Sequence, residues 1–249
     1  MYLLILILGL CIGSFLNVCI YRIPREESIA YPPSHCTNCG YELKSYDLVP
    51  VFSYLCLKGS CRNCKEKISV IYPTIEILNG IIYLMLFIKY DLTFKFIFYS
   101  ILASLLIVIS IIDIKSKDVY SSTTILGLCF AIPYILIGGY LGEIRISNNL
   151  LGGIIGYGII FLIILTTRGM GEGDADIAGI CGLFVGIKGI LLSLFLAVVI
   201  GGVVASIILI LKLKNRKSEI AFGPCIALGT FIWILFGEKL LSLYLNLFI

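Results

Sequence analysis

The stretch Arg168-Gly169-Met170-Gly171-Glu172-Gly173-Asp174-Ala175-Asp176 is a polar break between two strongly apolar segments. A carboxylate beside a membrane span costs free energy, so its presence there favours a functional role. A second acid, Asp113, ends another apolar stretch, Ile111-Ile112-Asp113-Ile114-Lys115. Two acids carried by different spans can meet at one membrane surface, and a pair of carboxylates is the minimum equipment of an aspartic protease.

The apolar segments around these acids indicate a multi-span membrane protein. Of the 249 residues, 59% are hydrophobic and 14% are charged, with a mean hydropathy of +1.06, whereas about a quarter of the residues in soluble proteins are charged. Segments long enough to cross about 30 Å of hydrocarbon lie at 2–20, 70–88, 94–114, 120–139, 149–166, 176–187, 190–211 and 221–237. The sixth is short and lies directly against the seventh. We therefore predict an all-α polytopic membrane protein with about eight transmembrane helices.

The basic residues predict the orientation of these spans. With eight spans and the N-terminus outside, the outer segments hold only Lys89, Lys95, Arg145, Lys188 and Lys239. The other 14 of the 19 Lys and Arg residues lie inside, as the positive-inside rule requires. The first stretch has no basic residue before it and no small-residue cleavage site after it, so we expect a retained span and not a removed signal peptide.

The net charge of +4 is therefore mostly a consequence of membrane topology. A nucleic-acid-binding protein would carry a basic face with base-reading or stacking residues on a soluble domain, and the sequence contains no such face. We expect a lipid bilayer as surroundings and no nucleic-acid partner.

One sizeable soluble segment, residues 21–69, follows the first span, and the predicted orientation places it in the cytoplasm. It contains two C-x-x-C pairs, Cys36 with Cys39 and Cys61 with Cys64, separated by 21 residues. This spacing is close to that of four-thiolate zinc sites. So short a segment buries little core without such a link, and in a reducing cytoplasm the thiols should bind Zn²⁺ instead of forming disulfides.

Other interpretations of these cysteines remain open. The two pairs can be reduced or redox-active dithiols, although the thioredoxin-like context that would favour redox chemistry is missing. His35 adjoins the first pair, but with four thiolates available we expect it to be a loop residue. The cysteines in or beside the spans are expected to behave as small apolar side chains.

The two acids also have structural interpretations. Asp113 can be an interfacial acid that ends the third span, and Asp174 can be the N-cap of the next helix, a role that is compatible with catalysis. Gly171 and Gly173 favour catalysis, because glycines let an extended backbone approach a substrate peptide closely. Two carboxylates within hydrogen-bonding reach share one proton, so that one can deprotonate a water while the other polarises the scissile carbonyl. Asp118 and Asp176 lie nearby as further candidates.

The order of several short motifs adds a resemblance to a known family. The motifs are Gly13-Ser14-Phe15-Leu16-Asn17-Val18-Cys19-Ile20-Tyr21-Arg22-Ile23-Pro24-Arg25, Pro32-Pro33-Ser34-His35-Cys36, Asp47-Leu48-Val49-Pro50-Val51-Phe52-Ser53-Tyr54, Cys64-Lys65, Ile68-Ser69, Tyr72-Pro73-Thr74-Ile75-Glu76 and Gly171-Glu172-Gly173-Asp174. Each motif is only moderately specific, but the ordered set resembles the type IV prepilin peptidases, bifunctional leader peptidases and N-methyltransferases.

The resemblance implies a fold, an activity and a location. It implies a bacterial cytoplasmic membrane protein whose active site faces the cytoplasm, with Asp113 and Asp174 as the catalytic pair. The substrates would be type IV prepilins or pseudopilins, and S-adenosylmethionine would methylate the new N-terminal residue. The expected domains are a first helix over 1–20, a zinc-knuckle and methyltransferase segment over 21–69, and a peptidase domain over 70–249.

Two parts of the chain are less well covered by the resemblance. Lys115, Lys117 and Asp176 depart from the family's usual residues around the catalytic pair, although both acids are intact. No glycine-rich nucleotide loop is visible, so the residues that bind S-adenosylmethionine are unknown. Glu76, at the mouth of the second span, can neutralise a substrate ammonium or serve as a structural interface residue.

Two other functions compete with this one. A presenilin-like intramembrane aspartic protease shares the Gly-x-Gly-Asp element but would not account for the cysteine pairs or the motifs of the first loop. A transporter or membrane scaffold that uses a zinc module for docking would carry more polar residues deep in its spans. The sequence does not identify the particular substrate, the oligomeric state or the organism.

Overall fold

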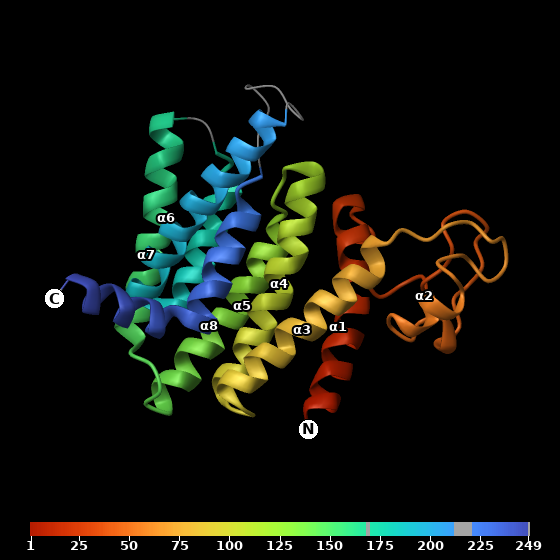
Figure 1. Cartoon of the computed structure of the whole chain (residues 1–249), viewed down its shortest axis with the longest axis horizontal. Helices are drawn as coiled ribbons and strands as arrows, with labels where there is room; N and C mark the ends of the chain where they lie inside the picture. Colours follow the sequence, from red (N-terminus) through yellow and green to blue (C-terminus); the bar gives the residue numbers. More distant parts are fainter. Residues whose placement is uncertain (168–169, 212–220, 249) are drawn as a thin grey trace. The chain divides into compact units, whose positions relative to one another are not determined.

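The computed structural model describes residues 1–167, 170–211 and 221–248, with side chains described up to Leu243. Within these ranges the chain is helical and has no strands, only two isolated β-bridges. The long helices (Figure 1) are α1 (Tyr2–Arg22), α3 (Ile71–Tyr90), α4 (Phe94–Ser116), α5 (Ser121–Tyr140), α6 (Ile146–Thr167), α7 (Glu172–Ile210) and α8 (Gly223–Phe248). Each is long and apolar enough to cross a membrane. The predicted all-α polytopic membrane class is therefore confirmed.

The chain forms two compact units, Met1–Phe96 and Ile97–Ile249. In the first unit, α1 and α3 pack against each other in antiparallel directions, because Gly9 lies against Gly80 while Gly13 lies against Glu76. A Cβ atom at Gly13 would be 2.7 Å from the Cα atom of Glu76, so only glycine permits this approach. Small residues commonly allow such close contact between membrane helices.

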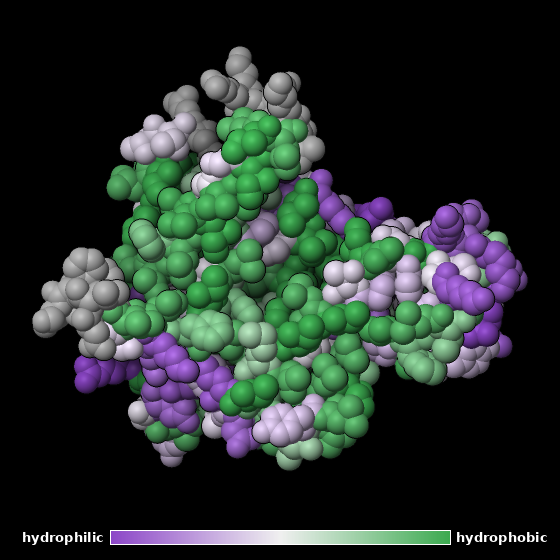
Figure 2. All heavy atoms as spheres, viewed as in Figure 1, coloured by the Kyte–Doolittle hydropathy of each residue, from purple (hydrophilic) through white to green (hydrophobic). Residues whose placement is uncertain are grey.

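The segment between α1 and α3 contains only short elements. These are the 3₁₀ helices η1 (Ile23–Arg25) and η2 (Ser45–Asp47) and the helix α2 (Phe52–Cys56). Figure 2 shows hydrophilic residues gathered on this segment, whereas most of the surface over α6 to α8 is apolar. This contrast is expected if the segment lies in water and the long helices lie in lipid.

Helix α7 is the element that differs most from its appearance in the sequence. Its 39 residues would extend about 58 Å as one straight helix, nearly twice the hydrocarbon thickness. At Gly186 the backbone leaves the helical region, with φ 69° and ψ −175°. Residues with a Cβ atom rarely adopt a positive φ, whereas glycine does so readily. Glycine at this position therefore permits the break in the helix.

The two halves of α7 fold back on each other at this break. Ala178 and Ile190 would lie about 18 Å apart along a continuous helix, yet both lie against Gly156 of α6. The spans predicted at 176–187 and 190–211 are therefore the two arms of a helical hairpin. This explains why seven helices are long enough to span a membrane, although about eight crossings were predicted.

The other predicted spans agree with the observed helices to within a few residues at most of their boundaries. Part of the evidence for the orientation falls outside the described ranges, namely Arg168 and the basic residues Lys212, Lys214, Arg216 and Lys217. The inside and outside assignments therefore stay predictions.

Candidate active site and cysteine cluster

Asp113 lies near the C-terminal end of α4 and is buried, with 5% of its surface exposed. Its Oδ2 atom accepts a hydrogen bond of 3.0 Å from the backbone N–H of Gly223. Gly223 is the first residue of α8, and helix N-termini carry N–H groups without helical partners. A Cβ atom at this position would be 2.7 Å from the same oxygen, so glycine is needed for the contact.

Asp174 lies in the first turn of α7, whose N-cap is Gly171, and it is also buried, with 7% exposed. An acid in the first helical turn is favoured by the partial positive charge of the helix N-terminus. No side-chain hydrogen bond caps this helix. The proposed N-cap role of Asp174 is therefore not the arrangement found, because Gly171 occupies that position.

The structure brings the two acids together. The carboxylates of Asp113 and Asp174 interact electrostatically, and both interact with Cys225 in the first turn of α8. Ile177, about one turn after Asp174, also lies against Gly223. The end of α4 and the starts of α7 and α8 therefore converge on one buried point that holds two carboxylates.

The other nearby acids are exposed. Asp118 follows α4 and interacts electrostatically with Asp113, whereas Asp176 interacts with Glu172. Both side chains are in contact with solvent, which makes them suitable comparison residues for the buried pair. Gly173 packs against Val119, where a Cβ atom would clash with the valine side chain. Packing inside the protein therefore accounts for this glycine, while Gly171 lies in open space.

Sequence reasoning missed the contribution of α8. Gly223 fixes one oxygen of Asp113, and Cys225 lies close enough to interact with both acids. The available signal was the pair Gly223-Pro224, because proline is favoured in the first turn of a helix and marks where the free N–H groups begin. Nothing in the sequence indicated which acid these N–H groups would meet.

The four predicted cysteines form one cluster. The sulfur atoms of Cys36, Cys39, Cys61 and Cys64 all lie within 4.8 Å of one another. Two sulfur pairs, Cys36 with Cys64 and Cys39 with Cys61, are 3.8 and 3.9 Å apart. Zn–S bonds of about 2.3 Å in a tetrahedron separate the sulfur atoms by about 3.8 Å. The four thiols can therefore hold a metal ion, and their spacing fits zinc.

The two cysteine pairs repeat the same backbone structure with an offset of 25 residues. The N–H of Cys36 donates to the carbonyl of Tyr41, and the N–H of Cys61 donates to the carbonyl of Glu66. A β-bridge supports each pair, His35 with Glu42 and Ser60 with Lys67. His35 thus belongs to the backbone support of the first pair, where its Nδ1 contacts the carbonyl of Pro33.

The residue after each pair adopts a left-handed conformation, which lets the loop close around the sulfur atoms. Gly40 has φ 70° and Lys65 has φ 61°. The side-chain amides cross between the pairs, since Asn38 donates to the sulfur of Cys64 and Asn63 donates to the sulfur of Cys39. Such outer contacts orient the ligands of metal sites.

Backbone donors also set the protonation of the thiols. The N–H of Tyr41 is the main reason that the pKa of Cys39 is lowered to about 6. The N–H of Cys64 lowers the pKa of Cys61 in the same way. The N–H of Glu66 lowers the pKa of Cys64, but burial and the neighbouring Cys39 and Cys61 outweigh it and raise this pKa to about 11. The cluster without a cation therefore retains a proton that a bound metal would displace.

An ion pair holds the loop before α2 onto the second cysteine pair. The Nε atom of Arg62 donates to Asp47 Oδ1 at 2.8 Å, and the Asp47 side chain is 1% exposed. The guanidinium also lies over the ring of Tyr46, 4.8 Å from its centre. Residues 45–47 are thus fixed to the cluster through the residue between two of its ligands.

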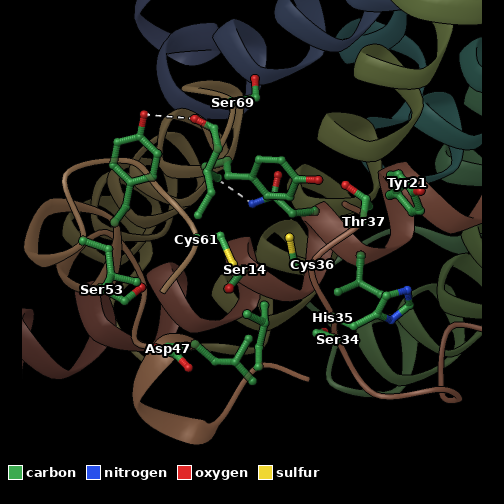
Figure 3. A pocket seen from close by; sticks show the side chains of 18 of the residues that line it. Ser14, Tyr21, Ser34, His35, Cys36, Thr37, Asp47, Ser53, Cys61 and Ser69 are labelled. Atoms are coloured by element: carbon green, nitrogen blue, oxygen red, sulfur yellow. Dashed lines mark hydrogen bonds between the residues drawn. The ribbon is translucent and has the colours of Figure 1, made fainter. Parts of the chain in front are cut away.

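A cavity of about 430 Å³ lies in the first unit, beside the cysteine cluster. Its walls come from the end of α1, the start of α3 and the segment between them. Figure 3 shows Ser14 and Tyr21 of α1 around the same cavity as Asp47, Cys36 and Cys61. This volume is within the range of sites for small molecules.

Comparisons with known proteins identify the family. The Bacterial Peptidase A24 N-terminal domain matches residues 7–90, and the Type IV leader peptidase family matches residues 100–206. The two matches follow each other in order and together cover most of the chain. An all-helical membrane fold with two buried acids at converging helix ends defines a candidate membrane-embedded aspartic peptidase. The chain belongs to the type IV leader peptidase family.

Several curated relatives carry the name prepilin leader peptidase/N-methyltransferase. The relative from Pseudomonas putida is 28% identical, with 94% of this chain and 90% of the relative aligned. The relative from Bacillus subtilis is 26% identical, with 98% of each chain aligned. The relative from Myxococcus xanthus is 31% identical, with 82% of this chain and 62% of the relative aligned. No solved structure matches the chain.

Proposed function

We propose that this protein removes the leader of type IV prepilins or pseudopilins and then methylates the new N-terminal residue. The observation that carries the proposal is the burial of Asp113 and Asp174 together at the start of α8, within a chain of the leader peptidase family. The relatives whose names include both activities align with most of this chain, including its N-terminal region.

Cleavage uses the two carboxylates and one water molecule. Two adjacent carboxylates hold one proton between them, so one is a base and the other an acid. The ionised carboxylate takes a proton from the water as its oxygen attacks the scissile carbonyl, and the protonated one donates to the carbonyl oxygen. The N–H of Gly223 restricts Asp113 to one orientation, which keeps the pair aligned for the reaction.

The acid pair faces the cytoplasm of a bacterial inner membrane in this proposal. The charge distribution favours this orientation, since the sequences next to both acids lie on the side with more Lys and Arg. The cysteine segment then lies on the same side, where reducing conditions keep its thiols available for a metal.

Zn²⁺ is the ion proposed for Cys36, Cys39, Cys61 and Cys64. Four thiolates at tetrahedral spacing leave no open position, which is the arrangement of a structural zinc site. The role proposed for the ion is to fold residues 21–69, because so small a segment gains much of its folding free energy from metal binding.

Methyl transfer is assigned to the same cytoplasmic segment together with the ends of α1 and α3 that line its cavity, and cleavage to the rest of 70–249. S-adenosylmethionine, when bound, supplies a methyl group on a sulfonium that an amine can attack. The cavity beside the cysteine cluster has the size and the aromatic and acidic side chains that suit such a cation. A cleaved substrate would find this segment on the membrane face where its new N-terminus emerges.

Mass spectrometry of a processed prepilin tests both halves of the proposal. The purified protein, loaded with zinc, should shorten the substrate with or without S-adenosylmethionine. With the cofactor present, the mature N-terminal peptide should become heavier by one methyl group. Unmethylated product under conditions of complete cleavage would contradict the transferase half, and an intact substrate would contradict the peptidase half.

A presenilin-like protease or a docking scaffold explains less of the molecule. Neither accounts for a cavity with buried acidic side chains next to a four-thiolate cluster, and the match to the A24 N-terminal domain covers this region. The scaffold also gives no reason for burying two acids together, which costs free energy unless their charges are used.

A further inference from the structure

Glu76 is a buried acid of the cavity in the first unit that has no described ion-pair partner. It lies in the second turn of α3, with 8% of its surface exposed, and it lines the cavity together with Asp47. Glu27, Glu66 and Lys67 also line the cavity, but their side chains are exposed to water. Within residues 1–96, which are all described, Asp47 and Glu76 are thus the two buried carboxylates of this cavity.

The other buried charges of the cavity have partners within the protein. Asp47 pairs with Arg62, as described above. Arg22 of α1 donates to the carbonyls of Ser28 and Pro32, and so holds the loop that follows α1. Glu76 forms no ion pair with any described Lys, Arg or His side chain. No described cationic side chain therefore offsets a negative charge on Glu76.

The contacts that Glu76 does make hold a strained turn. Its Oε2 atom accepts a hydrogen bond of 2.7 Å from the N–H of Val51, and the Ser14 side chain also bonds to it. Val51 has φ 61° and ψ −49°, an unfavourable conformation for a β-branched residue. The N–H of Phe52 donates to the carbonyl of Pro50, which makes a γ-turn. Strain of this kind persists where the surroundings enforce it, often at ligand sites.

A structural role alone does not require the charge of Glu76. A glutamine of the same shape would accept the hydrogen bond from Val51 through its amide oxygen. Burying an ionised carboxylate without a cation costs much more free energy than burying an amide. The unneutralised charge therefore points to a cationic ligand that enters the cavity.

We propose that Glu76 binds the N-terminal ammonium of the cleaved substrate and accepts its proton during methyl transfer in this cavity. This inference rests on the methyltransferase half of the proposed function. The sulfonium centre of the cofactor is also cationic, but it has no N–H proton whose removal would create a nucleophile. The substrate ammonium needs a carboxylate as a base, because it has no lone pair with which to attack a methyl group until it loses a proton.

The reaction at Glu76 balances without a further reactant. The carboxylate takes one proton from the ammonium, which leaves a neutral amine with a lone pair. The nitrogen then forms a bond to the methyl carbon, the carbon–sulfur bond breaks, and its electron pair stays on sulfur as a neutral thioether. The product is a methylated ammonium, and the proton on Glu76 passes to water.

The test compares Glu76→Gln with the parent and with Glu42→Gln, which removes an exposed acid from the segment between α1 and α3. All three should cleave the substrate equally and contain the same zinc, which shows that they are folded. At pH 7, Glu76→Gln should methylate about 100-fold more slowly, the size of a general-base effect. The defect should shrink as the pH rises through about 8, where the α-amine becomes neutral without help.

Peptide binding gives a readout that does not depend on methyl transfer. The probe is a short peptide that begins at the residue exposed by cleavage, tested by calorimetry without cofactor, in free and N-acetylated forms. The parent should bind the free peptide at least tenfold more tightly than the acetylated one, and Glu76→Gln should bind both equally. The variant Glu76→Asp, which keeps the charge, should retain the preference for the free amine.

The outcomes separate this inference from the function on which it rests. If the parent never methylates a substrate that it cleaves, the transferase half of the proposed function fails. If the parent methylates and Glu76→Gln methylates equally well, only the role of Glu76 fails. A defect that is the same at every pH, or an unchanged preference for the free peptide, would likewise overturn the role of Glu76.

Discussion

The cysteine cluster and the aspartate pair differ in how their residues are brought together. The four cysteines lie within one short segment, on two loops that repeat the same backbone turns. The two acids lie on α4 and α7, and the N–H that fixes Asp113 belongs to a residue 110 positions away. The first site is thus built by local loop geometry and metal ligation, whereas the second depends on the packing of three helix ends. A substitution that disrupts one site should therefore leave the structure of the other site intact.

The largest effect is expected from removing one charge of the aspartate pair. Asp113→Asn and Asp174→Asn should each lower the rate of leader cleavage by at least about 1000-fold, because each removes the acid or base that proton transfer requires. Zinc content should not change. A gel shift of a co-expressed prepilin measures cleavage, and elemental analysis measures zinc.

The exposed acids Asp118 and Asp176 provide the matched controls. Their asparagine variants should cleave at close to the parent rate, because they lie outside the buried point where the helices converge. A variant of Asp113 or Asp174 that still cleaves at a substantial fraction of the parent rate would remove that residue from the pair.

The next largest effect is expected at the other site. Changing Cys36, Cys39, Cys61 or Cys64 to Ser should abolish zinc binding, because each removes one of four ligands. The rate of methylation should fall at least as much as the rate of cleavage. The proposed transferase segment loses the metal that folds it, whereas the helices that carry Asp113 and Asp174 are unchanged. Purified parent protein with no zinc and intact free thiols would contradict the zinc assignment. Cys11→Ser and Cys129→Ser, at exposed positions on α1 and α5, should leave the zinc content unchanged.

A smaller effect on the rate of cleavage is expected from a substitution of Gly223, at the start of α8, which donates a hydrogen bond to Asp113. In Gly223→Ala the new Cβ atom would lie 2.7 Å from Asp113 Oδ2, so the hydrogen bond must lengthen or the acid must shift. We expect cleavage to slow about 10- to 100-fold, the range for a displacement of about 1 Å in an active site. Gly158→Ala is the control, because nothing lies within 4 Å of that position. Equal cleavage rates for the two variants would show that the contact from α8 does not matter.

The cysteine cluster is built from local loops and the acid pair from distant helix ends, and this difference determines how much of each site the sequence predicts. The ligands of the cysteine cluster are predictable because C-x-x-C spacing fixes a turn, and two such turns suffice for four ligands. The acids are predictable as candidates because polar residues stand out beside apolar spans. The role of Gly223 is not predictable, since it depends on which helix ends converge.

The helices illustrate the limit of reading spans from hydropathy. The length of apolar sequence predicts α1, α3, α4, α5 and α6 well, because each is bounded by polar residues or turns. The boundary within α7 is marked by one polar residue, Lys188, two positions after the break. Only the backbone at Gly186 reverses the chain there, and glycine is too frequent in membrane helices to indicate a reversal by itself.

The smallest expected effect concerns the ion pair that supports the cysteine cluster. Asp47→Asn keeps the shape of the side chain but removes the charge that Arg62 contacts. Because the Arg62 side chain is 45% exposed, water screens the pair, and we expect only a small loss of stability. That loss should appear as a few-fold faster release of zinc to a chelator, with cleavage unchanged.

The pH dependence of this effect follows from the pKa of Asp47. Burial raises it, but hydrogen bonds from Arg62 and from the Lys44 N–H outweigh burial, so the pKa lies below its usual range. A depressed pKa means that the stabilisation is complete above the unfolded value of about 3.9 and is lost as the pH falls through the folded value. Asp47→Asn should therefore accelerate zinc release by the same factor at pH 6 and at pH 7.5. A factor that changes between these two pH values, or release as fast as in a cysteine variant, would mean that Asp47 acts on the thiolates themselves and not through Arg62.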